Sequence, residues 1–212
     1  MSVVTSVYED LRHKIITGRL QASADLTEME LSKTYDASRN TVKKALIMLA
    51  NEQLIVLEPN RGARVKTYSV EEVLDYLQVR IKLEGMVIEL LPGHIMPTDI
   101  ASLESTLVAM DHFLRENDIA RYSEQNQLFH KILYDACPNR MLIEVMDNIK
   151  RHISKYSLKT DLVPGRAEKS LTEHRAIVDA LKVGDFDQAK QAMVYHVTNV
   201  RPKFEQNYHL LL

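Results

Sequence analysis

Apolar residues recur at helical spacing near the start of the chain and predict three short helices. The first covers residues 4–16, and residues 20–26 are expected to form a loop. Thr27 offers an N-cap oxygen, with Glu30 three residues further on, which predicts the start of a second helix. Ser38 caps a third helix after a short turn. Two short helices joined by a tight turn are typical of a helix-turn-helix.

Two strand-like runs follow, at 54–57 and 63–65, around the turn residues 59–62, so a hairpin is expected beside the helices. From Ser69 onward the apolar period becomes that of long amphipathic helices, separated by Pro, Gly, Asn and Asp. The expected helices are 70–91, 97–116, 119–136, 140–158, 167–183 and 185–208.

This pattern predicts a mainly α fold: a winged helix-turn-helix over 1–68, for DNA binding, and an all-α six-helix bundle over 69–212. Only six Gly and six Pro occur in 212 residues, too few for a turn-rich all-β fold. No apolar run reaches the roughly eighteen residues of a membrane span. The start of the chain lacks signal-peptide character, and the single cysteine, Cys137, cannot form an internal disulfide. A cytoplasmic location is therefore expected.

The distribution of charge says more than the net charge of −2. Residues 38–66 hold six basic and two acidic side chains, and a local basic patch is what a compact DNA-binding domain needs. The alternative is a solvated surface on which basic residues gather by chance. The six basic residues are Arg39, Lys43, Lys44, Arg61, Arg64 and Lys66.

The first turn of the third helix carries the side chains best suited to base contacts. Arg39 can pair with guanine O6 and N7, worth about 1–3 kcal/mol of discrimination. Lys43 lies one turn further on the same face, for a phosphate or a guanine. In the hairpin, Arg61 and Gly62 are expected at the tip. The residues predicted to contact DNA are Thr27, Ser38, Arg39, Asn40, Thr41, Lys43, Lys44, Arg61 and Gly62.

Three histidines and one asparagine fall on or beside the apolar stripes of three predicted helices. Burying such groups singly costs about 1–3 kcal/mol each, whereas one shared cation would satisfy all of them. These ligands suit zinc, or nickel or another first-row ion. For any one histidine, the alternative is a core side chain bonded to a backbone carbonyl. The four residues are Asn126, His130, His174 and His196.

The segment from "YEDLRHKIITGRL" through "SRNTVKKAL" to "RGARV" resembles the N-terminal domain of the GntR family of transcriptional regulators. The resemblance covers about 6–66 and implies that the third helix enters the major groove of a palindromic operator, with the wing near the minor groove and the protein acting as a homodimer. Met29 and Lys43 replace arginines that the family often carries, and Lys43 gives up bidentate recognition. The operator sequence therefore cannot be transferred.

The stretches "NQLFHKIL", "SLTEHRAIVDALKVGDFDQA" and "AMVYHV" resemble the FCD effector domain of the FadR subfamily, over about 70–205, in its smaller VanR-like branch. The resemblance implies a metal site on the four residues named above, with Asn126 where the family often has Asp, which should weaken metal binding. It also implies small carboxylate effectors.

Arg80 in "RIKLEG" matches an arginine of that domain's first helix and could clamp a carboxylate through both nitrogens. The alternative is a surface ion pair with Glu84, four residues further on. Asn148, Arg151 and Tyr195 are further candidates for the effector cavity.

The predicted function is a DNA-binding transcriptional regulator, a repressor whose operator affinity depends on a carboxylate effector, and not an enzyme. A metal-dependent hydrolase is the first alternative, but no H-E-x-x-H motif is present, and Glu173 should point about 100° away from its neighbour His174. A winged-helix scaffold for protein contacts is the second.

Overall fold

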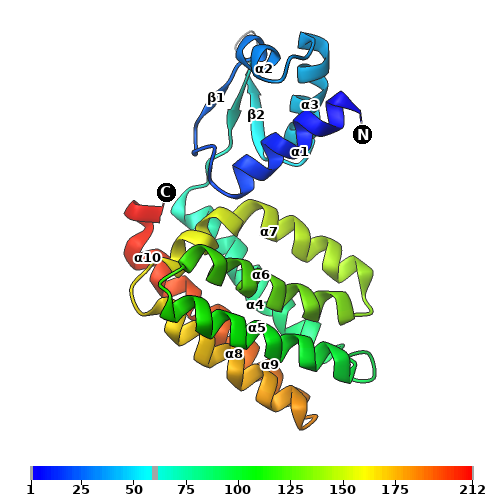
Figure 1. Cartoon of the computed structure of the whole chain (residues 1–212), viewed down its shortest axis with the longest axis vertical. Coiled ribbons are helices and arrows are strands. Elements are labelled where there is room, and N and C mark those ends of the chain that lie inside the picture. Colours follow the sequence, from blue (N-terminus) through cyan, green and yellow to red (C-terminus); the bar gives the residue numbers. More distant parts are fainter. Residues whose placement is uncertain (1, 59–61, 212) are drawn as a thin grey trace. The chain divides into compact units, whose positions relative to one another are not determined.

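The chain divides into an N-terminal unit, Met1–Ser69, and a C-terminal unit, Val70–Leu212, in the computed structural model. The structure describes residues 2–58 and 62–211. Both units are built mainly from helices, and each has its own hydrophobic core (Figure 1).

Helices and a small antiparallel sheet make up the N-terminal unit, with the strands in the order β1-β3-β2. Leu11 of the first helix and Val42 and Leu46 of the third are almost fully buried, so their apolar faces form this unit's core. The predicted helix-turn-helix and hairpin are both present. The elements are α1 (Val3–Ile16), β1 (Asp25–Leu26), α2 (Glu28–Thr34), α3 (Arg39–Asn51), β2 (Ile55–Glu58) and β3 (Gly62–Val65).

The strand β1 corrects the expectation of a loop over 20–26. Asp25 pairs with Arg64 and Leu26 with Ala63. Two residues are too short to show an alternating pattern, and this strand forms because β3 offers it backbone partners. The pairing also explains Gly62. Its φ is +100°, and a Cβ there would lie 2.5 Å from the carbonyl oxygen of Leu26, so only glycine fits.

The C-terminal unit is a helical bundle in which α5 packs along α6, and α9 lies against both α4 and α8 (Figure 1). None of the helices in the described part of the chain is long and apolar enough to span a membrane. The helices are α4 (Val70–Glu89), α5 (Pro97–Arg115), α6 (Ile119–Ala136), α7 (Arg140–Asp161), α8 (Arg166–Lys182), α9 (Phe186–Thr198) and α10 (Val200–Leu211).

The last predicted helix, 185–208, is interrupted in the structure. α9 ends at Thr198, its C-cap Asn199 donates its N–H to the carbonyl of Tyr195, and α10 begins at Val200. Pro202 has no N–H to give to the carbonyl of Thr198, four residues earlier, so a continuous helix would lose that bond. Residues 70–211 therefore contain seven helices where six were expected.

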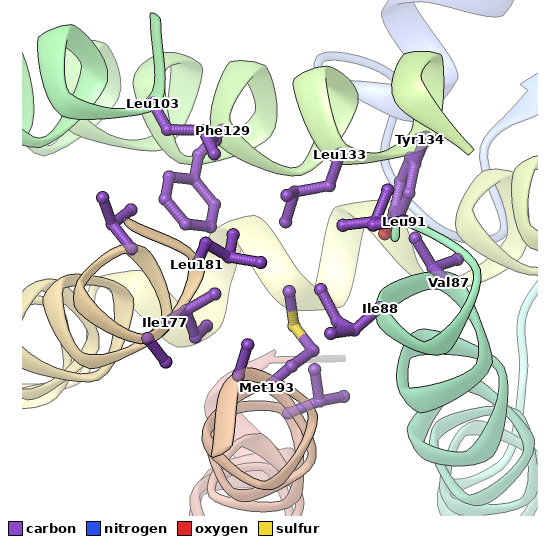
Figure 2. Close-up of a cluster of buried hydrophobic side chains, with 14 of the residues drawn as sticks. Val87, Ile88, Leu91, Leu103, Phe129, Leu133, Tyr134, Ile177, Leu181 and Met193 are labelled. Carbon is purple, nitrogen blue, oxygen red and sulfur yellow. The ribbon is translucent and has the colours of Figure 1, made fainter. Parts of the chain in front are cut away.

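Apolar side chains from the six helices α4 to α9 fill the centre of the bundle. Figure 2 shows Phe129 and Leu133 of α6 facing Ile88 of α4, Leu181 of α8 and Met193 of α9. This core fixes α6, α8 and α9 relative to one another, and the polar groups described below project from the same three helices.

Candidate functional site

Three imidazoles converge inside the bundle. His130 projects from α6, His174 from α8 and His196 from α9, and all three are buried. One nitrogen from each ring lies within 4.8 Å of those of the other two. The ring centroids of His174 and His196 are 4.2 Å apart, and those of His130 and His196 are 5.4 Å apart. Helical spacing predicted that these side chains share one interior, and the structure brings them together.

The imidazoles are electrically neutral at physiological pH. Burial lowers the pKa of each ring well below the ordinary histidine value, and neighbouring positive charges such as Arg80 and Arg166 add to the effect. A neutral imidazole keeps a lone pair, so each ring can act as a ligand for a cation.

Hydrogen bonds fix which nitrogen of His196 is free. Its Nδ1 lies 2.8 Å from Glu173 Oε2, so Nδ1 carries the proton and Nε2 is left to bind a ligand. The same carboxylate receives hydrogen bonds from Arg166 at 2.9 Å and Asn199 at 2.7 Å. Sequence reasoning missed that Glu173 orients the histidine of α9.

The other two rings have nitrogens that the surrounding side chains do not satisfy. His174 Nδ1 lies 3.5 Å from Ser170 Oγ, while its Nε2 is buried without a hydrogen-bond partner among the described residues. His130 Nδ1 is likewise unsatisfied there and lies 3.8 Å from Glu84 Oε1. Orphaned buried nitrogens in one cluster are costly as they stand, and a divalent cation would fit this donor set.

Asn126 lies one turn before His130 on α6 and joins the same cavity lining. Its Nδ2 donates to Asp161 Oδ2 at 3.4 Å, and Ser123 Oγ donates to the same oxygen at 2.8 Å. Burial raises the pKa of the Asp161 carboxyl, and these two hydrogen bonds oppose the rise. Asp161 was not predicted, because nothing in the sequence links the end of α7 to α6.

Arg80 and Glu84 form an ion pair, with Arg80 Nε 3.0 Å from Glu84 Oε1, but the pair is buried, not on the surface. Tyr134 also donates to Glu84 at 2.6 Å. Arg80 at the same time lines a cavity of about 100 Å³ with His130 and His196. The two interpretations of Arg80 are thus compatible. The other polar or charged residues lining this cavity are Ser123, Asn126, Gln127, Lys150, Thr160, Asp161, Arg166 and Ser170.

The three remaining effector candidates lie elsewhere. Asn148 is exposed and its Oδ1 is 3.1 Å from His152 Nε2. Arg151 is half-buried, and Tyr195 is 56% exposed, beside the ammonium of Lys169. None of the three lines the cavity that holds His130 and His196. Tyr195 precedes the buried His196 by one position, and successive residues of a helix point about 100° apart.

The N-terminal unit presents its basic side chains on α3. Ser38 caps this helix by accepting from the Thr41 N–H at 3.1 Å, and its hydroxyl lies 2.8 Å from that of Thr41. Arg39, Asn40, Lys43 and Lys44 are exposed. The cap thus holds the start of the helix while leaving the charged groups free for a partner.

Arg39 and Lys43 line a surface hollow of about 700 Å³ with Thr27 of the α2 cap and Gly62 of β3. The Thr27 hydroxyl is engaged by Glu30, accepting from its N–H and donating to its carboxylate. Arg61 lies outside the described residues. Arg64, counted in the basic patch, is paired with Asp25 and Glu58 at 3.0 and 3.3 Å.

A winged helix-turn-helix joined to a helical bundle with a buried polar cavity defines a ligand-responsive DNA-binding protein. Comparison with known families agrees. Residues 4–65 match the bacterial regulatory proteins of the gntR family, and residues 75–199 match the FCD domain. The chain belongs to the GntR family of transcriptional regulators, in the group that carries an FCD domain as its effector-binding domain.

Similar proteins are regulators along nearly their whole length. The transcriptional repressor RspR of Escherichia coli K12 is 24% identical over 200 residues, covering 94% of this chain and 88% of RspR. The gluconate operon transcriptional repressor of Bacillus licheniformis is 25% identical, covering 92% of this chain and 82% of the repressor. These relatives are regulators and not enzymes, which confirms that part of the prediction.

Solved structures share the fold. E. coli McbR/YncC superposes with a TM-score of 0.82 at 20% identity, covering 97% of this chain and 99% of the other. A putative GntR transcriptional regulator from Rhodococcus sp. RHA1 gives 0.79 at 23% identity, covering 98% and 100%. The predicted fold class, a winged helix-turn-helix with an all-α FCD bundle, is confirmed.

Proposed function

We propose that this regulator is a repressor that binds a palindromic operator as a homodimer. Its affinity for the operator changes when a small carboxylate binds in the bundle. Arg39 and Lys43 contact base edges and phosphates of the operator. Asn40, Thr41 and Lys44 contact phosphates of the DNA backbone. Support comes from the capped start of this helix, on which all of these side chains except that of Thr41 are exposed. A cytoplasmic location follows from the DNA target.

The metal site consists of the three imidazoles together with the Oδ1 of Asn126, and the cation is zinc, with nickel as the alternative. The observation that carries this proposal is the convergence of three neutral, buried imidazoles whose nitrogens lie within 4.8 Å of one another. When bound, the metal supplies a Lewis acid that a carboxylate can ligate. Glu173 holds His196 in the tautomer that suits a ligand.

Arg80 contributes a positive charge to the cavity lining, where it can attract the carboxylate of the effector. Its guanidinium is held by Glu84, so it is oriented before a ligand arrives. An effector that binds differently to the two functional states of the protein changes operator affinity by a coupling of about 1–3 kcal/mol. The sign of that change is part of what the experiment below measures.

The test uses two variants and one duplex. Selection from a random duplex pool with the purified protein yields a binding sequence, and fluorescence anisotropy then measures affinity. Arg39→Ala is expected to lose sequence-specific binding while retaining metal, and His174→Ala is expected to lose metal and any carboxylate response while still binding the duplex. Native mass spectrometry reports dimer and metal in the same preparations. A His174→Ala protein that keeps its metal contradicts the site.

The hydrolase alternative has no support in the bundle. The carboxylate of Glu173 already accepts from Arg166, His196 and Asn199, so it is not available as a general base. The duplex experiment distinguishes the proposed regulator from the scaffold alternative, because a module that only contacts proteins selects no sequence from the duplex pool.

A further inference from the structure

The amide of Asn126 contacts the carboxylate of Asp161 and lines the cavity that His130 and His196 also line. Its nitrogen donates to Asp161 Oδ2 at 3.4 Å. Its oxygen is buried and has no hydrogen-bond partner among the described residues, although it belongs to the lining of the cavity with His130 and His196. The amide nitrogen is thus held by Asp161, while the amide oxygen has no partner among the described residues.

Asp161 determines the orientation of the Asn126 amide. Because Asp161 Oδ2 accepts the hydrogen bond, the amide turns its NH₂ group toward Asp161 and its oxygen away. The opposite rotamer would place two oxygens against each other and present an NH₂ group to the cavity, and an NH₂ group cannot ligate a cation. Ser123 donates to the same oxygen of Asp161 at 2.8 Å and holds the carboxylate in place.

The charge of the proposed metal site also supports a role for Asp161. Three neutral imidazoles and an amide oxygen bring no negative charge to a divalent cation, whereas a carboxylate at position 126 would bring one. Asp161, in contact with Asn126, supplies a negative charge from one residue further out. Carboxylates behind a ligand raise its basicity and fix its orientation, and their loss typically costs 10–100-fold in metal affinity.

We propose that Asp161 is a positioning residue of the metal centre: it aims the Asn126 oxygen at the cation and carries the negative charge that Asn126 lacks. This inference rests on the proposed metal site. It assigns a role to the last residue of α7, a helix that contributes none of the three imidazoles.

Zinc affinity of the full-length protein, measured by competition with a chromophoric chelator after metal removal, tests the inference. Asp161→Asn keeps the shape but removes the charge, and is expected to weaken zinc binding about 10–100-fold. Asp147→Asn, an exposed carboxylate on the same helix, is the matched control and should bind zinc as the wild type does. Ser123→Ala removes one hydrogen bond to Asp161 and should cause a smaller loss.

A charge swap gives the decisive readout. In the double variant Asn126→Asp/Asp161→Asn, the carboxylate moves to the ligand position and the amide now donates from position 161, so zinc affinity should return to within a few-fold of the wild type. The visible spectrum of the cobalt-substituted proteins should show the same coordination in wild type and double variant. A merely structural Asp161 would not be rescued by this exchange.

The outcomes separate this inference from the metal site itself. If the wild type binds zinc, His174→Ala does not, and Asp161→Asn binds like the wild type, the role of Asp161 is overturned and the site stands. If the double variant is as weak as Asp161→Asn, the role of Asp161 is likewise overturned. If the wild type and His174→Ala both fail to bind zinc, the metal site and this inference fall together. Should Asp161→Asn not fold, unchanged affinity in Ser123→Ala overturns the inference.

Discussion

Among the glycines, Gly62 is the one at which the surrounding backbone leaves least room for a side chain. Its φ of +100° disfavours any other residue, and an added Cβ would collide with the Leu26 carbonyl oxygen at 2.5 Å. Gly62→Ala should therefore lower the free energy of unfolding of the N-terminal unit by about 3 kcal/mol. Urea denaturation followed by circular dichroism measures this change.

Gly18→Ala is the matched control for that prediction. Gly18 also has a positive φ, +72°, but no atom lies within 4 Å of the position its Cβ would take. Only the left-handed backbone is penalised there, at about 1 kcal/mol. Equal losses in the two variants would mean that the contact between β3 and β1 has been misjudged.

The imidazole cluster was predictable at the residue scale, and its supporting carboxylates were not. His174 and His196 fall on apolar stripes and His130 lies beside one, so helical periodicity predicts that all three point inward. Glu173 and Asp161 act on residues of other helices, His196 and Asn126, and such pairings depend on how helices pack. A single sequence holds no signal for that packing.

The first turn of α3 combines a structural cap with the proposed DNA contacts, and the two roles can be separated. Aspartate caps a helix as well as serine does, whereas alanine does not, and the loss costs about 1 kcal/mol. Ser38→Ala should therefore reduce stability, while Ser38→Asp should retain it. The added negative charge of Ser38→Asp should nevertheless weaken duplex binding at low salt about tenfold or more, because the proposed orientation of α3 places position 38 near phosphates.

Thermal denaturation and anisotropy with the selected duplex provide the two measurements. Ser2→Ala, which removes the equivalent cap from α1, controls for a general loss of helix stability. If Ser38→Asp binds the duplex like the wild type, the start of α3 does not face DNA, and the proposed orientation of the recognition helix is wrong.

Helices were predicted well where their own residues carry the caps and the apolar stripe. The caps at Thr27 and Ser38 and the long amphipathic stripes were all visible in the sequence. The strand β1 was missed because it exists only through its pairing with β3, and the break near Asn199 was missed because Pro202 lies inside an otherwise regular apolar stripe. In both cases the deciding interaction involves backbone groups and not the pattern of side chains.

Metal removal should affect the two units of the molecule differently. A ligand that binds only the folded state stabilises it by an amount set by its concentration relative to its Kd, about 4 kcal/mol at a thousandfold excess. Chelation should thus speed amide exchange in α6, α8 and α9, which carry the imidazoles, and leave α1 to α3 unchanged. Hydrogen exchange with mass spectrometry of the full-length protein measures both.

The comparison protein for that experiment is His174→Ala, in which the chelator should change nothing. An equal acceleration across α1 to α3 would indicate that the N-terminal core depends on the metal directly, contrary to the separate cores of the two units.

The ion pairs of Arg64 with Asp25 and Glu58 have a thermodynamic consequence for operator binding. A guanidinium already matched by two carboxylates displaces few condensed cations from a duplex, so Arg64 should contribute little to the dependence of affinity on ionic strength. The exposed basic side chains of α3 should contribute more. Complexes of this regulator should accordingly tolerate added salt better than its count of basic residues suggests.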